Sequence, residues 1–243
     1  MNGIFDVKTL TDGQFDVVYN VLSFGFACML ATTVFLYIST GRVLPKYRQA
    51  ITISGTVTLI ALYHYWRIFD SFVAASESGK TFNEAYRYVD WLLTVPLMCV
   101  EFYLITKKAG AKQSLLWKMI FASVIMLVTG YWGEAGLGNP TLWGTLSAIA
   151  YFYIVYEVWM GDVKKLATSS GTAVAQANTA LGWFVLVGWA IYPLGYLAGT
   201  ADGQWYSAFG NLNLNMDIIY NIGDAVNKIG FGLVIYALSR KEA

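Results

Sequence analysis

The sequence contains few of the residues from which soluble enzymes, metal sites and disulfide frameworks are built. Only 13% of its 243 residues are charged, and it has one histidine and two cysteines. Cys28 and Cys99 each lie within an apolar run, which favours small buried side chains over a disulfide or a metal site. The formal net charge of +1 comes without a clustered basic excess, which argues against a nucleic-acid-binding surface.

What the sequence has in excess is apolar length. Hydrophobic residues make up 57% of the chain, and the mean hydropathy is +0.51. Stretches long enough to cross about 30 Å of hydrocarbon run over residues 17–39, 50–75, 87–105, 115–133, 141–160, 178–198 and 214–239. Short connections with glycine, proline and polar residues join them. We therefore predict an all-α fold, a single seven-helix membrane domain over residues 1–243.

Lysine and arginine are distributed unevenly between the two sets of connections. One side holds Arg42, Lys46, Arg48, Lys107, Lys108, Lys112, Lys118, Lys164, Lys165, Arg240 and Lys241. The opposite side holds only Lys8, Arg67, Lys80 and Arg87. Because cytoplasmic connections carry the excess of positive charge, we predict an extracellular N-terminus and a cytoplasmic C-terminus. The third helix then runs from outside to inside.

Lys228 lies in the middle of the last predicted helix, in DAVNKIGFG. A lysine at the centre of a membrane helix costs roughly 2.5 to 3.5 kcal/mol on insertion scales. Asp224, four residues earlier, lies on the same helical face, so one interpretation is a structural ion pair in a seven-helix receptor or transporter without a chromophore. The other is a reactive amine, because a desolvated lysine can form a Schiff base with an aldehyde.

The third predicted helix carries polar residues at helical spacing in RYVDWLLTVPLMCVE. Arg87, Asp90, Thr94 and Glu101 fall at offsets that keep one face of the helix. Asp90 and Glu101 are separated by about three turns, or roughly 16 Å along the axis. They therefore cannot share a proton directly, but they can bracket a site between them.

The charges of these residues indicate how the two carboxyl groups differ. Asp90, Asp224, Arg87 and a protonated nitrogen on Lys228 sum to zero, as a buried charged cluster requires. Glu101 has no cation near it in the sequence. Burial then favours the protonated acid, which is the state that a proton donor needs.

These motifs, with GWAIYPLGY at 188–196 and DAVNK at 224–228, closely resemble those of microbial rhodopsins. The resemblance spans all seven helices and is closest to the proteorhodopsin and xanthorhodopsin group of light-driven proton pumps. It implies that all-trans retinal is attached to Lys228. It also implies that Asp90 is the counterion and primary proton acceptor, that Asp224 is the second counterion, and that Glu101 is the cytoplasmic proton donor.

The remaining polar residues of the third helix fit the same resemblance. Arg87 would belong to the counterion cluster, and the triplet of Asp90, Thr94 and Glu101 resembles the proton-pump signature of the family. The implied function is outward proton transport driven by light. The rival within the family is a photosensor that signals through a partner. Glu101 argues against the photosensor, because a sensor has no need of fast reprotonation.

The resemblance also assigns a retinal pocket. Trp91, Trp189, Tyr192 and Tyr196 would wall the polyene, although core or lipid-facing packing is the default interpretation of aromatic residues in a membrane helix. Met98 lies one turn before Glu101, where an apolar residue goes with green absorption in this family.

Three further residues are assigned by position. His64, the single histidine, is similar to the family histidine that hydrogen-bonds the acceptor aspartate near a protomer interface. Gly144 is by default a packing glycine, but xanthorhodopsin-like proteins have a glycine there that admits a carotenoid antenna. Glu134 is a candidate for extracellular proton release, although loop carboxylates are usually only solvated. The resemblance further implies a homo-oligomer, a pentamer or similar ring, in the inner membrane.

Overall fold

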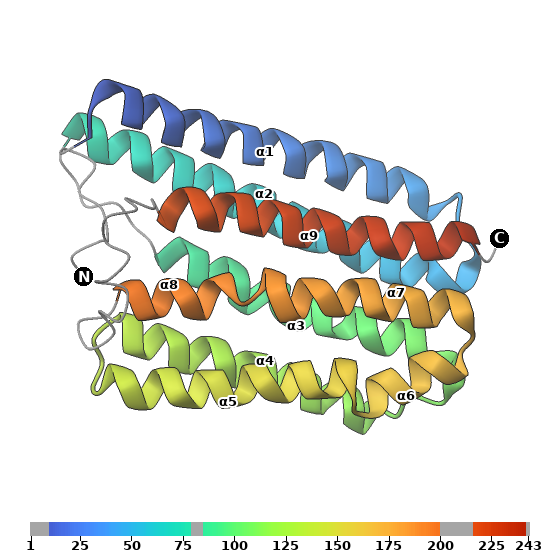
Figure 1. Cartoon of the computed structure of the whole chain (residues 1–243). Helices are drawn as coiled ribbons and strands as arrows, with labels where there is room; N and C mark the ends of the chain where they lie inside the picture. Colours follow the sequence, from blue (N-terminus) through green and yellow to red (C-terminus); the bar gives the residue numbers. More distant parts are fainter. Residues whose placement is uncertain (1–9, 79–84, 200–215, 242–243) are drawn as a thin grey trace.

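A computed structural model describes residues 10–78, 85–199 and 216–241 of the chain. In these residues the regular structure is entirely helical, and the long helices lie side by side in a bundle (Figure 1). The helices are α1 (Asp12–Thr40), α2 (Pro45–Ser78), α3 (Ala85–Thr106), α4 (Gln113–Glu134), α5 (Pro140–Trp159), α6 (Asp162–Ser169), α7 (Thr172–Trp183), α8 (Ile191–Gly199) and α9 (Met216–Lys241). A short 3-10 turn, η2 (Lys107–Ala109), follows α3, and a π-helical segment, η3 (Phe184–Gly188), joins α7 to α8. The elements α7, η3 and α8 follow one another as a single rod, so the described helices make seven passes along the length of the bundle. The predicted seven-helix fold is confirmed.

Consecutive helices pack as neighbours from α1 to α5. The last helix, α9, returns to the start of the chain and packs against α1 and α2, while η3 and α7 lie on its other side (Figure 1). The interior of the bundle is therefore lined by α3 and α9 with the rod of α7, η3 and α8 beside them. These elements carry most of the polar residues singled out in the sequence.

The outer surface of the bundle suits lipid. Large apolar side chains point outward on several helices, including Phe24, which is 70% exposed, and Ile149, which is 62% exposed. Among the described residues, five helices are long and apolar enough to span a membrane, at Asp12–Thr40, Ala85–Ala109, Gln113–Glu134, Thr172–Leu197 and Ile219–Lys241. Polar residues along α2, including Thr52, Ser54, Thr56, Thr58 and His64 in its middle part, and the tyrosines and glutamate of α5 lower the mean hydropathy of these two helices.

The sixth pass differs from its prediction. It was expected over residues 178–198, but α7 already begins at Thr172, after the short helix α6 that the hydropathy pattern did not indicate. Gly171 connects the two helices with φ of 106°, a left-handed conformation that glycine adopts without steric strain. The predicted start of the last helix, residues 214–215, lies outside the described residues. The direction of the chain across the membrane stays a prediction.

The π-helical segment η3 leaves backbone carbonyls without their usual partners, and neighbouring helices satisfy them. The Tyr151 hydroxyl, from α5, lies 3.0 Å from Val185 O and 2.8 Å from Leu186 O. From α9, Asn227 Nδ2 donates to Gly188 O at 3.0 Å. A Cβ atom on Gly188 would overlap the Asn227 side-chain amide, so glycine allows this close approach. Segments of this kind inside helices are frequent at functional sites, and Asn227 directly precedes Lys228.

Candidate functional site

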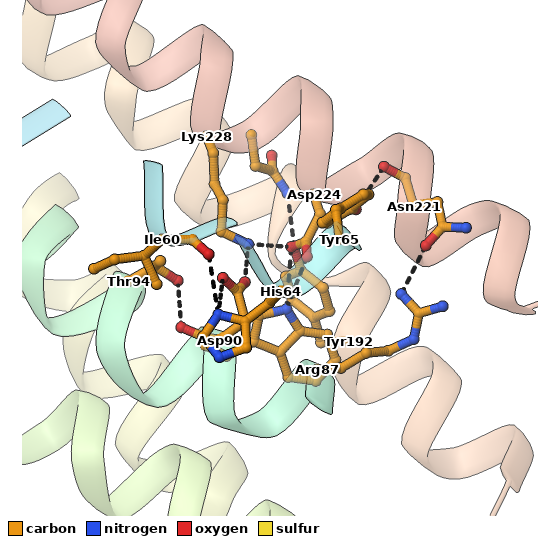
Figure 2. Close-up of polar contacts among 12 residues, drawn as sticks. Ile60, His64, Tyr65, Arg87, Asp90, Thr94, Tyr192, Asn221, Asp224 and Lys228 are labelled. Atoms are coloured by element: carbon orange, nitrogen blue, oxygen red, sulfur yellow. Dashed lines mark hydrogen bonds and ion pairs between the residues drawn. The ribbon is translucent and has the colours of Figure 1, made fainter. Parts of the chain in front are cut away.

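The charged residues of the bundle interior meet at Lys228, between α9 and α3 (Figure 2). Lys228 Nζ lies 2.7 Å from Asp90 Oδ2 and 2.8 Å from Asp224 Oδ1. Lys228 is 3% exposed, and both carboxylates are 1% exposed. Asp224 reaches the amine from the same face of α9, one turn earlier, and α3 brings Asp90 from the opposite side. Three buried charges are therefore paired with one another, which is the arrangement that makes burial of charge tolerable.

Asp224 is fixed by hydrogen-bond donors from two other helices. Trp91 Nε1 lies 3.1 Å from each carboxylate oxygen of Asp224. The Tyr192 hydroxyl, from α8, donates to Asp224 Oδ1. Asp90 has a different environment, since its contact beyond Lys228 is with His64 Nδ1, 3.5 Å from Oδ1. The two carboxylates that contact the amine are thus chemically unequal.

His64, on α2, lies beside Asp90 of α3, the residue with which the sequence prediction paired it. Its Nδ1 atom is closer to Ile60 O, at 3.0 Å, than to Asp90 Oδ1, at 3.5 Å (Figure 2). Ile60 O can only accept, so a proton on Nδ1 serves this carbonyl first and faces Asp90 second. The ring therefore couples α2 to the Asp90 carboxylate at the edge of hydrogen-bonding distance.

The Arg87 side chain extends toward Asn221 of α9 and away from the Lys228 amine (Figure 2). Its Nη1 atom donates to Asn221 Oδ1 at 2.8 Å, and its guanidinium lies 5.6 Å from the centre of the Tyr220 ring. The Tyr65 hydroxyl donates to Asn221 O at 2.9 Å. Figure 2 shows Asn221 one turn from Asp224 on α9, toward Arg87. Asn221 was not predicted, although its spacing of three and seven residues from Asp224 and Lys228 marks the same helical face.

Glu101 is buried apart from this cluster. Its carboxyl group is 0% exposed, and Ser54 Oγ from α2 lies 2.7 Å from Oε1. Eleven residues of α3 separate it from Asp90, roughly 16 Å along the axis. Thr94, between them, donates its hydroxyl to the Asp90 backbone carbonyl at 2.9 Å. The Glu101 carboxyl group is therefore separate from the charged cluster of Lys228, Asp90 and Asp224. The sequence did not indicate its contact with Ser54.

An apolar cavity of about 290 Å³ lies next to the cluster. Four of the predicted pocket residues line it, Trp91, Trp189, Tyr192 and Tyr196. Because Trp91 and Tyr192 also donate to Asp224, the inner end of the cavity borders the carboxylate that pairs with Lys228. Met98 is buried in the packed core and is not among the residues that line the cavity.

The lining of this cavity suits a conjugated apolar molecule. Aromatic rings face it from α3 and α8, and two of its lining residues, Trp91 and Tyr192, donate to the carboxylate that pairs with Lys228. Retinal, an apolar polyene with an aldehyde that a lysine can attack, fits both features. The residues that would hold it are Lys228 for the covalent bond and Trp91, Trp189 and Tyr192 for the walls.

Gly144 lines the same cavity on α5. A Cβ atom there would lie 2.6 Å from Tyr196 Cε1, so any larger residue would force the Tyr196 ring to move. Thr141 and Thr145, which are exposed, also line the cavity. The cavity therefore reaches the outer surface of the bundle along this face of α5.

Glu134 is not a loop residue, which corrects the sequence interpretation. It is the last residue of α4, it is only partly exposed, and its Oε2 atom accepts a hydrogen bond from the Tyr88 hydroxyl of α3. Tyr88 directly follows Arg87. The hydrogen bond between Tyr88 and Glu134 thus joins the end of α4 to the turn of α3 that carries Arg87.

Comparison with known proteins gives consistent matches over most of the chain. The sequence pattern of the family described as bacteriorhodopsin-like protein matches residues 18–242. The chain is 40% identical over 218 residues to the green-light absorbing proteorhodopsin of Gamma-proteobacterium EBAC31A08. It is 41% identical over 219 residues to the blue-light absorbing proteorhodopsin of Gamma-proteobacterium Hot 75m4. Each alignment covers 89% of this chain and 84% of the relative.

The fold is similar to that of solved structures. The crystallographic structure of xanthorhodopsin, described as a light-driven ion pump with dual chromophore, matches with a TM-score of 0.81 at 33% identity and covers 96% of both chains. The chain is accordingly a multi-pass protein of the cell membrane.

Proposed function

The chain belongs to the bacteriorhodopsin-like protein family, and from that premise we propose that it is a light-driven outward proton pump with retinal bound covalently to Lys228. One observation carries the proposal: Lys228 Nζ lies between Asp90 and Asp224, and the two side chains that donate to Asp224, Trp91 and Tyr192, line an aromatic cavity, while Glu101 is buried separately on α3. Xanthorhodopsin, whose structure is similar to this chain, is described as a light-driven ion pump, which supports ion transport driven by light. The protein is then a transporter and not an enzyme, because no substrate is converted.

Retinal, when bound, supplies light absorption and an isomerisation that changes the access of the Lys228 nitrogen. The protein supplies the proton positions on either side. Asp90 is the acceptor because of how the two carboxylates are held. Protonating Asp224 would weaken its hydrogen bonds from Trp91 and Tyr192, whereas Asp90 has beyond Lys228 only the more distant His64 Nδ1, at 3.5 Å, among its described side-chain contacts.

Glu101 is the donor that returns a proton to the Lys228 nitrogen from the other side. Its burial favours an uncharged acid at rest, because its carboxyl group pairs with the neutral Ser54 hydroxyl and with no cation among the described residues. When it gives up its proton, the Ser54 hydroxyl can stabilise the resulting carboxylate at 2.7 Å. With the predicted orientation of the chain, uptake at Glu101 is cytoplasmic and release beyond Asp90 is extracellular. Glu134, hydrogen-bonded to Tyr88, is the release candidate.

The chromophore is tested by adding all-trans retinal to the apoprotein. A visible absorption band should form in the wild type and in Lys118→Ala, a control lysine on α4 outside the site, but not in Lys228→Ala. If no band forms, or if Lys228→Ala keeps it, the retinal hypothesis fails and the structural ion pair of a receptor or transporter without a chromophore explains Lys228 better.

The direction of transport is tested in unbuffered cells. Cells that express the protein with retinal should acidify their medium under illumination, and a protonophore should abolish the signal. A protein with the visible band but without acidification would instead be a photosensor that signals through a partner.

We also propose that a carotenoid antenna binds at Gly144, because the cavity reaches the outer surface at Thr141 and Thr145. A carotenoid in that opening could transfer excitation energy to retinal. The excitation spectrum of light-driven acidification should then show carotenoid bands after reconstitution, and Gly144→Trp should remove them while the retinal band stays. A spectrum without such bands contradicts the antenna.

A ring-shaped homo-oligomer, a pentamer or similar, is proposed through the outer face of α2. Tyr63 and Trp66, next to His64, are 54% and 51% exposed, and large aromatic residues are enriched at protein interfaces. Native mass spectrometry should show the ring and its weakening in Trp66→Ala. A monomer in both proteins contradicts this assembly.

A further inference from the structure

A second cavity, of about 220 Å³, lies at the end of the bundle that carries the C-terminus. It lies between the start of α2, the end of α3 with η2, and the turn from α6 to α7 (Figure 1). By the predicted orientation this end is cytoplasmic. Its apolar lining is formed by Tyr47, Leu104, Ile105 and Val174. Tyr47, Ile105 and Val174 are buried and form its floor.

The rim of this cavity is positively charged. Lys46 from α2 and Lys108 from η2 both line it, and the described lining contains no acidic residue. The Lys46 ammonium lies 4.8 Å from the centre of the Tyr47 ring, which keeps it against the cavity wall. Two cations above a low-dielectric floor focus a positive potential in the cavity. The cavity therefore favours an anion.

The hydroxyl groups of the cavity narrow the class of anion. Ser169 Oγ and Ser170 Oγ both donate to Leu166 O, so each has acceptor lone pairs left for a ligand. An oxyanion that carries its own O–H group can donate to these oxygens while its negative oxygens face the lysines. Inorganic phosphate keeps at least one O–H group near neutral pH in both its singly and its doubly charged form, and a phosphate monoester, whose second pKa is about 6, keeps one in its singly charged form.

The position of the cavity connects it to the proton donor. Ile105, in its floor, is one helical turn beyond Glu101 on α3. Glu101 itself is 0% exposed, so its proton must come through this end of the bundle or past other packed residues. A proton source held in this cavity would therefore lie at the end of the bundle that α3 reaches one helical turn beyond Glu101.

We propose that this cavity binds a phosphate-type oxyanion, either free phosphate or a phosphomonoester lipid headgroup, and that its acid form reloads Glu101. In this step the O–H bond of the bound dihydrogen phosphate breaks, the proton adds to the Glu101 carboxylate, and monohydrogen phosphate remains. The reloading role rests on the proposed pump function, whereas the binding site does not.

Binding is tested in the dark with the retinal-loaded protein in phosphatidylcholine nanodiscs. Inorganic phosphate is titrated at constant ionic strength and followed by ³¹P NMR, with chloride as the comparison anion. Saturable binding should be about tenfold weaker in Lys46→Gln/Lys108→Gln, as the loss of two ion pairs predicts. Lys107→Gln is the matched control, because its ammonium lies over the Tyr103 ring and does not line the cavity; its affinity should change less than about twofold.

The lipid source is tested with nanodiscs that contain phosphatidic acid but no free phosphate. A headgroup in the cavity should be retained by the wild type and by Lys107→Gln through detergent exchange, and lost from the double variant. If neither phosphate nor phosphatidic acid shows binding that the double variant weakens, the site is refuted.

The reloading role is tested by flash photolysis of the same samples. The rate of Glu101 reprotonation should rise with phosphate and saturate at the concentration that saturates dark binding, or rise with phosphatidic acid alone. Binding without any change in this rate refutes the delivery role. Binding that persists in a protein without light-driven acidification refutes the pump and leaves the binding site standing.

Discussion

Replacement of Ser54 by alanine should slow proton donation by Glu101. The Ser54 hydroxyl, 2.7 Å from Oε1, is the hydrogen bond that the structure gives this carboxyl group. The other oxygen, Oε2, has no hydrogen-bond partner among the described residues. In Ser54→Ala, the carboxylate formed by donation would therefore be buried without a donor.

The size of the effect follows from the charge of the group. A hydrogen bond to a charged group contributes about 1.5 to 3 kcal/mol, and 1.36 kcal/mol corresponds to a factor of ten in rate. If the lower value applies in the transition state, reprotonation of the Lys228 nitrogen should slow by about tenfold. The early step, in which Asp90 accepts a proton, should keep its rate because Ser54 does not contact the cluster.

The assay is time-resolved absorbance after a laser flash, with the two proton transfers followed separately. Thr58→Val is the matched control, since Thr58 is a buried hydroxyl one turn along α2 that bonds backbone carbonyls and accepts from Thr33. It should leave both rates within about twofold of the wild type. Equal slowing in both variants, or no slowing in Ser54→Ala, would refute a role for this hydrogen bond.

Two further substitutions test the packing around the amine. Gly188→Ala should destabilise the protein by about 1 to 3 kcal/mol, because its Cβ would overlap a side-chain amide of α9. Gly13→Ala has open space and should leave the thermal midpoint unchanged; equal midpoints in the two variants would refute the close approach. Tyr192→Phe removes a donor from Asp224, leaves more negative charge facing Lys228, and should shift the visible band to shorter wavelength. Tyr196→Phe is its control, because the Tyr196 hydroxyl donates to Pro140 O, and an unshifted band in Tyr192→Phe would contradict the assigned contact.

The helical fold and the approximate course of its passes were predictable from the sequence, because long apolar runs in a membrane have few alternatives to helices. Residues on one helix were also predictable as neighbours. The offset of four residues between Asp224 and Lys228 places them on one face in any regular helix. The short helix α6 was not predictable in this way, because it lies outside the apolar runs and has no span-length signal.

Contacts between helices depended on packing that no local pattern encodes. Arg87 was expected to belong to the counterion cluster, but its hydrogen bond to Asn221, from a different helix, could not be predicted from the sequence. The contact of Ser54 with Glu101 joins residues 47 positions apart, and only the adjacency of α2 and α3 brings them together. The π-helical segment could not be predicted either, because the side chains that hydrogen-bond its backbone carbonyls come from α5 and α9.

The most direct test of the account is the light-driven pH change of cells that express wild type, Asp90→Asn or Glu101→Gln, each normalised to the amount of retinal-bound protein. The carboxyl groups of Asp90 and Glu101 are assigned to opposite sides of the Lys228 nitrogen, as proton acceptor and proton donor. Wild type should acidify the medium, Asp90→Asn should give no signal, and Glu101→Gln should give a signal reduced by about tenfold or more, as is typical when a positioned proton-transfer group is lost. Acidification by Asp90→Asn, or a wild-type rate in Glu101→Gln, would contradict the assignment of acceptor and donor.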